Sequence, residues 1–165
     1  MNEFSKALVS LQRNPLISIE KDYFGDLIGE WDIEWKEKFG TKEEKLIKGE
    51  WIFSRVLNGM GIQDLFILPS REERKRGIEP DGEYGTTIRT YNAKTGNWEI
   101  YYCCYGESTR LEAIKEQDKI VLTEIEYGKM RWIFREIKEE SFHWQHMKLI
   151  NDEWVVWCDC RAVRK

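Results

Sequence analysis

The chain has 165 residues, a length typical of one domain that buries a single core or encloses a small cavity. Its 26 Lys and Arg stand against 30 Asp and Glu, with both signs mixed along the chain, and the formal net charge of -4 excludes the basic surface typical of nucleic-acid binding. No apolar run approaches the length of about 18 residues that a membrane-spanning helix needs, which argues against a membrane partner.

The N-terminal region lacks a signal-peptide pattern, because charged residues interrupt every apolar run in it. We therefore expect a cytoplasmic protein. In that compartment Cys103, Cys104, Cys158 and Cys160 are expected to be reduced thiols on strands rather than disulfides.

Residues 2–12 predict a short amphipathic helix, because Phe4, Leu8 and Leu11 recur at helical spacing. The connector that follows this helix is also apolar. We expect residues 1–28, the N-terminal helix and connector, to cover one end of the structure that follows.

Residues 29–39 predict the first strand of a barrel. Trp31, Ile33 and Trp35 alternate with charged residues, and this period of two gives the strand one buried aromatic face and one solvated charged face. The rest of the chain is organised around this strand.

The same alternation recurs in short segments separated by tight turns, of which Asn58-Gly59 is a strong hairpin signal. Together with the first strand they make about ten strands. The expected later strands are residues 46–57, 60–68, 84–91, 98–104, 109–115, 120–127, 130–137, 141–149 and 154–163.

Because tight turns join these strands, each is expected to pair with the next, and closing the sheet on itself removes its two open edges. A sandwich is the alternative, but its crossovers need long connections, and only residues 69–83, otherwise a lid or an insertion, could supply one. The sequence therefore predicts an all-β, up-and-down antiparallel β-barrel of about ten strands over residues 29–165, with a short N-terminal α-helix, in a single domain of residues 1–165.

Gly29-Glu30-Trp31 stands on the first strand, and Arg161 and Arg164 stand at the end of the last. These two features resemble the calycin superfamily, which includes lipocalins and fatty-acid-binding proteins. The resemblance implies that the Trp31 indole packs against one of these arginines and closes one end of the barrel. A guanidinium laid on an indole covers the ring and keeps its own charge near solvent.

A closer resemblance rests on four stretches, residues 27–31, 89–98, 137–144 and 152–164. On these stretches the chain, from about Leu27 onward, is similar to a family of bacterial lipocalin-like domains of unknown function. The Arg-x-Tyr of the final strand of fatty-acid-binding proteins is absent, because Val163 stands two residues after Arg161. The resemblance therefore does not extend to fatty-acid binding.

The hairpin around residues 92–97 points to a ligand cavity. If Tyr91 pairs with Trp98 across the turn, alternate residues of both strands share one mostly aromatic inner face. Arg89 on that face either offers a cation to an anionic ligand or pairs with a buried acid such as Asp64. The candidate ligand-binding residues are Arg89, Tyr91, Trp98, Tyr102, Trp144 and His146.

The sequence contains no catalytic or metal-binding motif. His143 and His146 stand three apart on a predicted strand, so they point to opposite faces and cannot share one ion. Cys158 and Cys160 share a face, which we interpret as a pair of core thiols. We therefore predict no metal and no cofactor.

These observations predict a protein that binds a small hydrophobic or aromatic ligand, possessing an anionic group if Arg89 is free, and they favour a binding protein over an enzyme. The alternatives are a cavity enzyme acting on a small organic acid and a filled barrel serving as a protein-interaction module. A cavity above about 300 Å³ favours the first two classes over the third. The sequence leaves a homodimer open.

Overall fold

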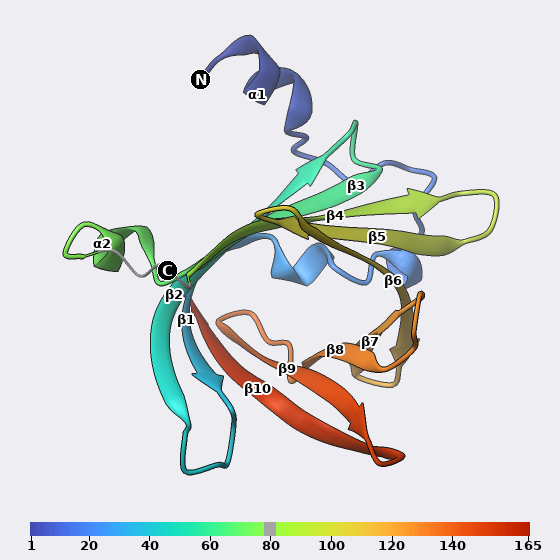
Figure 1. The fold of residues 1–165 in the computed structure, drawn as a ribbon. Helices are drawn as coiled ribbons and strands as arrows, with labels where there is room; N and C mark the ends of the chain where they lie inside the picture. The colour runs from blue at the N-terminus through green and yellow to red at the C-terminus, as the bar shows by residue number, and fades with distance from the viewer. Residues whose placement is uncertain (78–81) are drawn as a thin grey trace.

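The computed structural model describes residues 1–77 and 82–165. Ten antiparallel strands form one closed barrel, in which every strand pairs with the next in sequence and β1 closes against β10 (Figure 1). This is the up-and-down barrel that the sequence predicts. The strands are β1 (Gly29–Glu37), β2 (Lys45–Val56), β3 (Gly61–Leu68), β4 (Glu83–Asn92), β5 (Asn97–Cys104), β6 (Glu107–Glu116), β7 (Lys119–Glu124), β8 (Met130–Arg135), β9 (Ser141–Ile150) and β10 (Glu153–Arg164).

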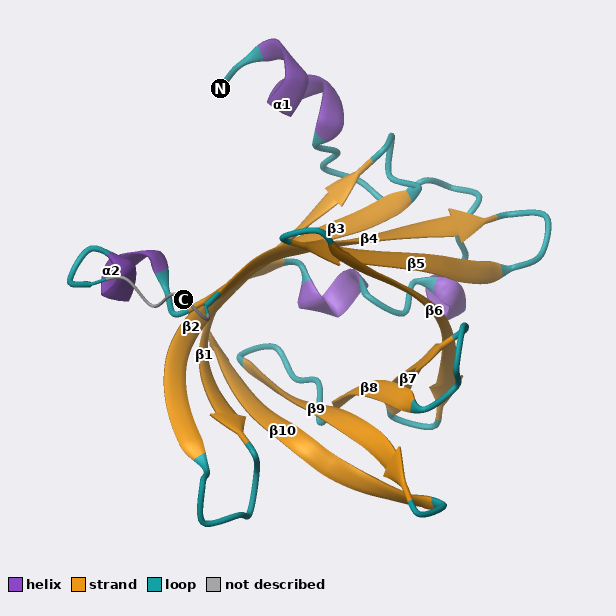
Figure 2. Ribbon diagram, in the orientation of Figure 1, coloured by secondary structure: helices purple, strands orange, loops and turns teal. Residues whose placement is uncertain are grey.

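The helical segments are short (Figure 2). They are α1 (Glu3–Leu8), the 3₁₀ turns Ile19–Lys21 and Gly25–Leu27, and α2 (Arg71–Arg74) in the connection from β3 to β4. That connection is the long loop expected at residues 69–83, of which residues 78–81 lie outside the described part of the chain.

The N-terminal helix forms as expected, but it does not cover the barrel. The Asn2 side chain caps α1 by accepting a hydrogen bond from the Ser5 backbone nitrogen, and no residue of the helix is buried. The apolar connector takes the covering role instead, because Ile17, Phe24 and Leu27 are fully buried in the core. A helix this short turns too few apolar side chains to one side to cover a barrel end.

Two tryptophans of the barrel wall form hydrogen bonds with the connector. The Trp31 indole nitrogen donates to the Leu27 carbonyl oxygen at 2.8 Å, and the Trp98 indole nitrogen donates to the Lys21 carbonyl oxygen at 2.7 Å. Both rings are buried, so these bonds satisfy donors that have no access to solvent. The connector therefore fills one end of the barrel and is held there by directed contacts.

Arg164 closes this filled end from outside. Its guanidinium carbon lies 4.1 Å from the centre of the Trp31 ring, and its Nη1 donates to the Ile28 carbonyl oxygen at 2.8 Å. Gly29 makes room for it, since Gly29 has φ 136° and a Cβ there would collide with the guanidinium. The arginine implied by the calycin resemblance is thus Arg164. Arg161 instead forms an exposed ion pair with Glu136.

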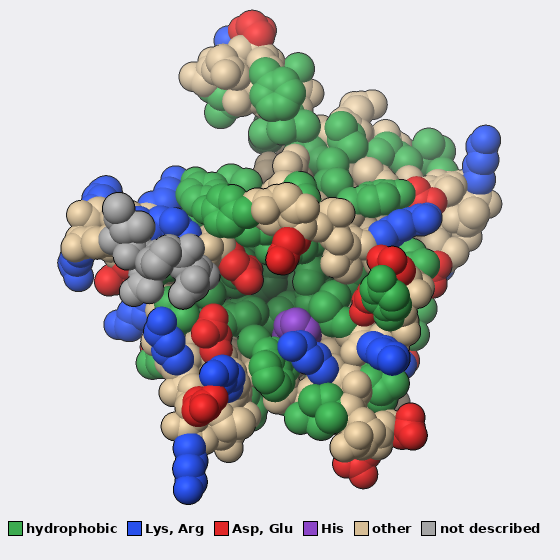
Figure 3. Space-filling view, viewed as in Figure 1, with side chains coloured by type: hydrophobic (Ala, Val, Ile, Leu, Met, Phe, Trp, Pro, Cys, Tyr) green, Lys and Arg blue, Asp and Glu red, His purple; other side chains and the backbone are tan. Residues whose placement is uncertain are grey.

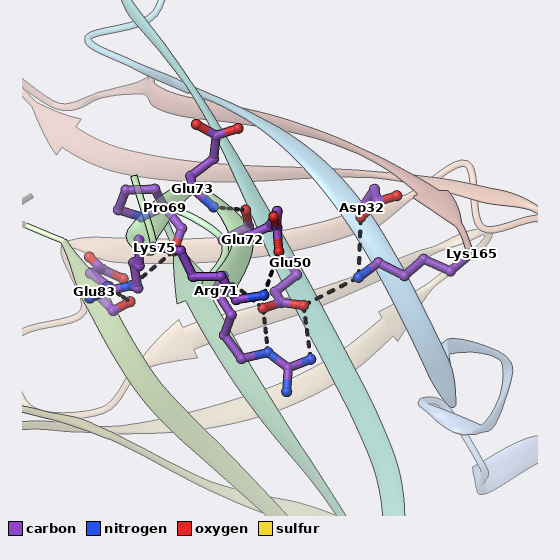
Figure 4. A network of polar contacts seen from close by, with 11 residues as sticks. Asp32, Glu50, Pro69, Arg71, Glu72, Glu73, Lys75, Glu83 and Lys165 are labelled. Atoms are coloured by element: carbon purple, nitrogen blue, oxygen red, sulfur yellow. Dashed lines mark hydrogen bonds and ion pairs between the residues drawn. The ribbon is translucent and has the colours of Figure 1, made fainter. Parts of the chain in front are cut away.

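A polar network on the outer face joins the C-terminus and α2 to β2 (Figure 4). Glu50 is only 3% exposed and accepts from the Arg71 Nε at 2.6 Å and from the Arg71 backbone nitrogen at 2.9 Å. Lys165 lies 3.2 Å from the same carboxylate and 3.3 Å from Asp32. The Arg71 hydrogen bonds outweigh burial and lower the pKa of Glu50 to about 2.

Trp31→Ala is expected to lower the free energy of unfolding by about 3–5 kcal/mol, because it removes a fully buried ring and leaves the Leu27 carbonyl without its donor. Urea unfolding followed by circular dichroism measures the change. Arg161→Ala, which removes only an exposed ion pair, is the control and is expected to change stability far less. A loss below about 1 kcal/mol for Trp31→Ala would contradict its closing role.

Glu50→Gln is expected to destabilise the protein at pH 7 by roughly 2 kcal/mol. This value is smaller than the free energy that corresponds to the whole pKa shift of Glu50, because its partner Arg71 is half exposed and solvent screens the pair. The folded-state pKa of Glu50 is depressed, so its stabilisation is present above the unfolded-state pKa of 4.5 and is lost as pH falls toward about 2. Urea melts at pH 7, 4.5 and 3 should therefore show the wild-type advantage shrinking. An advantage that stays constant over this range would refute the assignment.

Candidate functional site

The opposite end of the barrel is open and contains a cavity of about 430 Å³. Figure 3 shows this face as a hollow with hydrophobic side chains inside it, a histidine at its wall, and both acidic and basic side chains around it. The aromatic walls of the cavity are built by Trp35, Trp51, Phe66, Trp132, Trp144 and Trp157.

Trp144 on β9 is the centre of the aromatic wall. It stacks on Trp35 with ring centres 5.3 Å apart and planes 29° apart, and it meets Trp51 edge to face at 5.7 Å. Trp132 also packs against Trp144, with ring centres 5.9 Å apart and planes tilted by 52°. These are favoured geometries for aromatic pairs, and they fix the rings in a preformed surface.

The wall contains polar atoms that have no partner within the described residues. They are the indole nitrogens of Trp35, Trp51, Trp132 and Trp144, together with the Nε2 of His146. The indoles at the filled end differ, since Trp31 and Trp98 both donate to backbone carbonyls. A buried donor without an acceptor costs about 1–3 kcal/mol, so the four indoles of the wall carry unmet hydrogen-bonding capacity. Side-chain nitrogens of Arg89, Arg131 and His143, outside the cavity lining, are unpaired as well within the part of the chain that the structure describes.

His146 brings a neutral imidazole to the cavity. Burial is the main cause that lowers its pKa to about 4, and the positive charge of Lys148 lowers it further. At pH 7 the ring therefore carries one N–H donor and one nitrogen acceptor rather than a charge.

Carboxylates stand at the mouth of the cavity. Glu37, Glu83 and Glu107 line it, and the Tyr102 hydroxyl donates to Glu83 Oε2 at 3.3 Å. Burial raises the pKa of Glu83 above its ordinary value, against the opposing effect of the Tyr102 hydrogen bond. The mouth is thus acidic, whereas the interior is aromatic.

Three of the residues expected from the sequence line this cavity, namely Tyr102, Trp144 and His146. Tyr91 and Trp98 pair across the hairpin as expected, with ring centres 5.4 Å apart. However, Trp98 and Arg89 lie at the filled end against Phe24 of the connector, and Tyr91 packs on Trp98 there. The structure therefore brings three of the six expected residues to this cavity and places the other three outside its lining.

Arg89 forms a buried ion pair instead of facing a ligand. It is 1% exposed, and its Nη2 lies 2.7 Å from the Asp64 Oδ2. Its guanidinium also lies over the rings of Phe24 and Phe53, at 5.0 and 5.4 Å from their centres. Of the two roles that the sequence left open for Arg89, the structure shows the pairing with Asp64.

Sequence reasoning missed most of the wall and the whole acidic mouth. One signal was available, because in an up-and-down barrel the end of each odd strand and the start of each even strand share a rim. Glu37 ends β1, Glu83 begins β4 and Glu107 begins β6, so the topology places all three at one rim.

His143 and His146 lie on opposite faces of β9, as their spacing predicts. The His143 Nε2 lies 2.6 Å from the Asp159 Oδ1, away from the cavity that His146 lines. Within residues 1–77 and 82–165, no group of three His, Cys, Asp or Glu side chains is placed to hold a metal ion. No helix in that part of the chain is long and apolar enough to cross a membrane.

All four cysteines are free thiols, in environments that differ sharply. Cys103 is exposed, whereas Cys160 is fully buried and Cys158 lies at the cavity wall. Burial raises the pKa of Cys158 to about 12, which removes its reactive thiolate at neutral pH.

Alkylation of the native protein with iodoacetamide at pH 8 is expected to modify Cys103 first and Cys104 next, and to spare Cys158 and Cys160. Peptide mass spectrometry identifies the modified sites. In denaturant without reductant all four should react, and fewer than four would show that a disulfide is present. Rapid native modification of Cys158 would contradict its buried, protonated state.

The fold and site define a closed ten-stranded antiparallel β-barrel with one filled end and one open, aromatic cavity. The fold is similar to that in the crystal structure of Rv2717c from M. tuberculosis, with a TM-score of 0.60 over 93% of this chain and 99% of that chain. The two sequences are 11% identical over this match, so the likeness shows the fold alone. The sequence matches no family model and no curated protein.

Proposed function

We propose that this protein is a lipocalin-like binding protein that holds a small aromatic molecule in the open end of its barrel. The observation that carries the proposal is the group of unpartnered nitrogen atoms in the wall of one aromatic cavity. A cavity of about 430 Å³ lies in the range of small-molecule sites, which are mostly apolar with a few polar groups.

The wall indicates the chemistry of the ligand. The rings around Trp144 offer flat surfaces for a second aromatic system, and stacking or edge contacts with it add to the gain from burying its apolar area. A hydrogen-bond acceptor on the ligand would give an indole donor such as that of Trp144 the partner it lacks. An aromatic compound with an inner oxygen or nitrogen acceptor fits both features.

Other observations favour this ligand over the alternatives. The open cavity argues against a barrel filled throughout, which would serve only as an interaction module. The Arg89 charge is compensated by Asp64, which removes the reason to expect an anionic ligand. An enzyme would require a set of converging catalytic groups, and the neutral aromatic wall supplies binding surface instead.

Calorimetric titration with 1-naphthalenemethanol, which combines a flat ring with a hydroxyl acceptor, tests the proposal. Thr109 lines the cavity from β6, and Thr109→Phe is expected to fill it and weaken binding about tenfold or more. Ser108→Phe adds the same ring at the adjacent exposed position, on the other face of the strand, and is expected to leave affinity unchanged.

Native mass spectrometry of protein purified from its own host complements the titration, because it detects a retained ligand directly. Equal affinity in wild type and Thr109→Phe would place binding outside the cavity. No binding of the aromatic alcohol, together with no retained small molecule, would overturn the proposed function.

A further inference from the structure

We propose that the mouth of the cavity selects ligands whose outer end is cationic, so that an aromatic amine binds better than its neutral or acidic analogue. This inference rests on the proposed function, since it names the charge of the ligand in the same cavity. It follows from the distribution of charge around the mouth.

The carboxylates at the mouth have no cationic partner. Among the ion pairs within residues 1–77 and 82–165, none includes Glu37, Glu83 or Glu107. Two buried acids elsewhere in the barrel are compensated, since Asp64 pairs with Arg89 and Glu50 pairs with Arg71. The three carboxylates at the mouth therefore carry negative charge that the protein itself leaves unmatched.

The positive groups near the mouth do not cancel this charge. Lys38 also lines the cavity, but its Nζ lies 2.6 Å from the carboxylate of Glu43 and is neutralised there. Lys148 lies with its Nζ 4.0 Å from the centre of the Trp157 ring. Lys45 stands opposite Glu37 in the register of β1 and β2 but forms no ion pair with it within the described residues. Glu83 and Glu107 therefore keep the field at the mouth negative.

Glu83 shows that a cation would be favourable at this place. Its carboxylate is partly buried and accepts one hydrogen bond, from the Tyr102 hydroxyl. Burial raises its pKa, which means that the surroundings disfavour the charged form. An ammonium group beside Glu83 would stabilise that charge through a shielded ion pair.

The aromatic wall supports the same choice and points to a ligand independently. Trp35, Trp51 and Trp144 are each more than nine-tenths buried, line the cavity, and hold indole nitrogens without acceptors. The negative faces of indole rings attract a cation within about 6 Å, in addition to the carboxylates. An aromatic amine would thus place its ring inside the cavity and its ammonium group at the mouth.

The experiment compares three compounds with one ring and different end groups: 1-naphthylmethylamine, 1-naphthalenemethanol and 1-naphthoic acid. Calorimetric titration at pH 7 in low salt is expected to rank the amine about tenfold or more above the alcohol, and the acid last. The double variant Glu83→Gln/Glu107→Gln should lose the preference for the amine and keep its affinity for the alcohol. Glu112→Gln, an exposed change on the outer face of β6, is the control and should behave as wild type.

The outcomes separate this inference from the proposed function. If the alcohol binds and the amine binds no better, or if the acid binds best, selection of a cation is overturned and aromatic binding stands. If the amine preference survives in the double variant, these carboxylates are not its source. If none of the three compounds binds, the proposed function fails and this inference fails with it.

Discussion

The pairing of β1 with β10 is the constraint on which the rest of the structure depends. Without it the ten strands would form an open sheet with two unpaired edges and an aromatic face exposed to water. With it, rings from strands far apart in the sequence meet in one interior, as Trp31 of β1 meets Phe142 of β9 at 4.8 Å between ring centres. Arg164 on β10 secures the closure by covering the indole of Trp31 on β1.

The closed barrel has two different ends because the N-terminal connector enters only one of them. It brings Phe24 into the interior and offers backbone carbonyls to the indoles of Trp31 and Trp98. At the other end no segment within the described residues enters in this way, and the indoles of Trp35 and Trp144 keep unpaired nitrogens. The end filled by the connector therefore contributes packing and hydrogen bonds that stabilise the fold, whereas the open end keeps the cavity.

The fold was predictable from the sequence, whereas the site was predictable only in part. Period-two alternation and short turns define strands, faces and neighbours, so Tyr91 was correctly paired with Trp98. Alternation does not say how deep along the axis a residue lies, and Tyr102 shares a face with Arg89 although only Tyr102 reaches the cavity. The depth depends on which barrel end the connector fills. That choice is made by tertiary contacts, such as the hydrogen bond between Trp98 and Lys21, which no local pattern reveals.

The closure of the barrel also has a consequence for the order in which the molecule assembles during synthesis. β1 is among the first strands to leave the ribosome, and its partner β10 is the last of the ten. Until β10 emerges, β1 has only β2 beside it, and its alternating Trp31, Ile33 and Trp35 lack the far wall of the interior. During this time the aromatic edge strand β1 is exposed to association with other chains. The charged residues on its outer face, such as Asp32 and Glu34, disfavour that association.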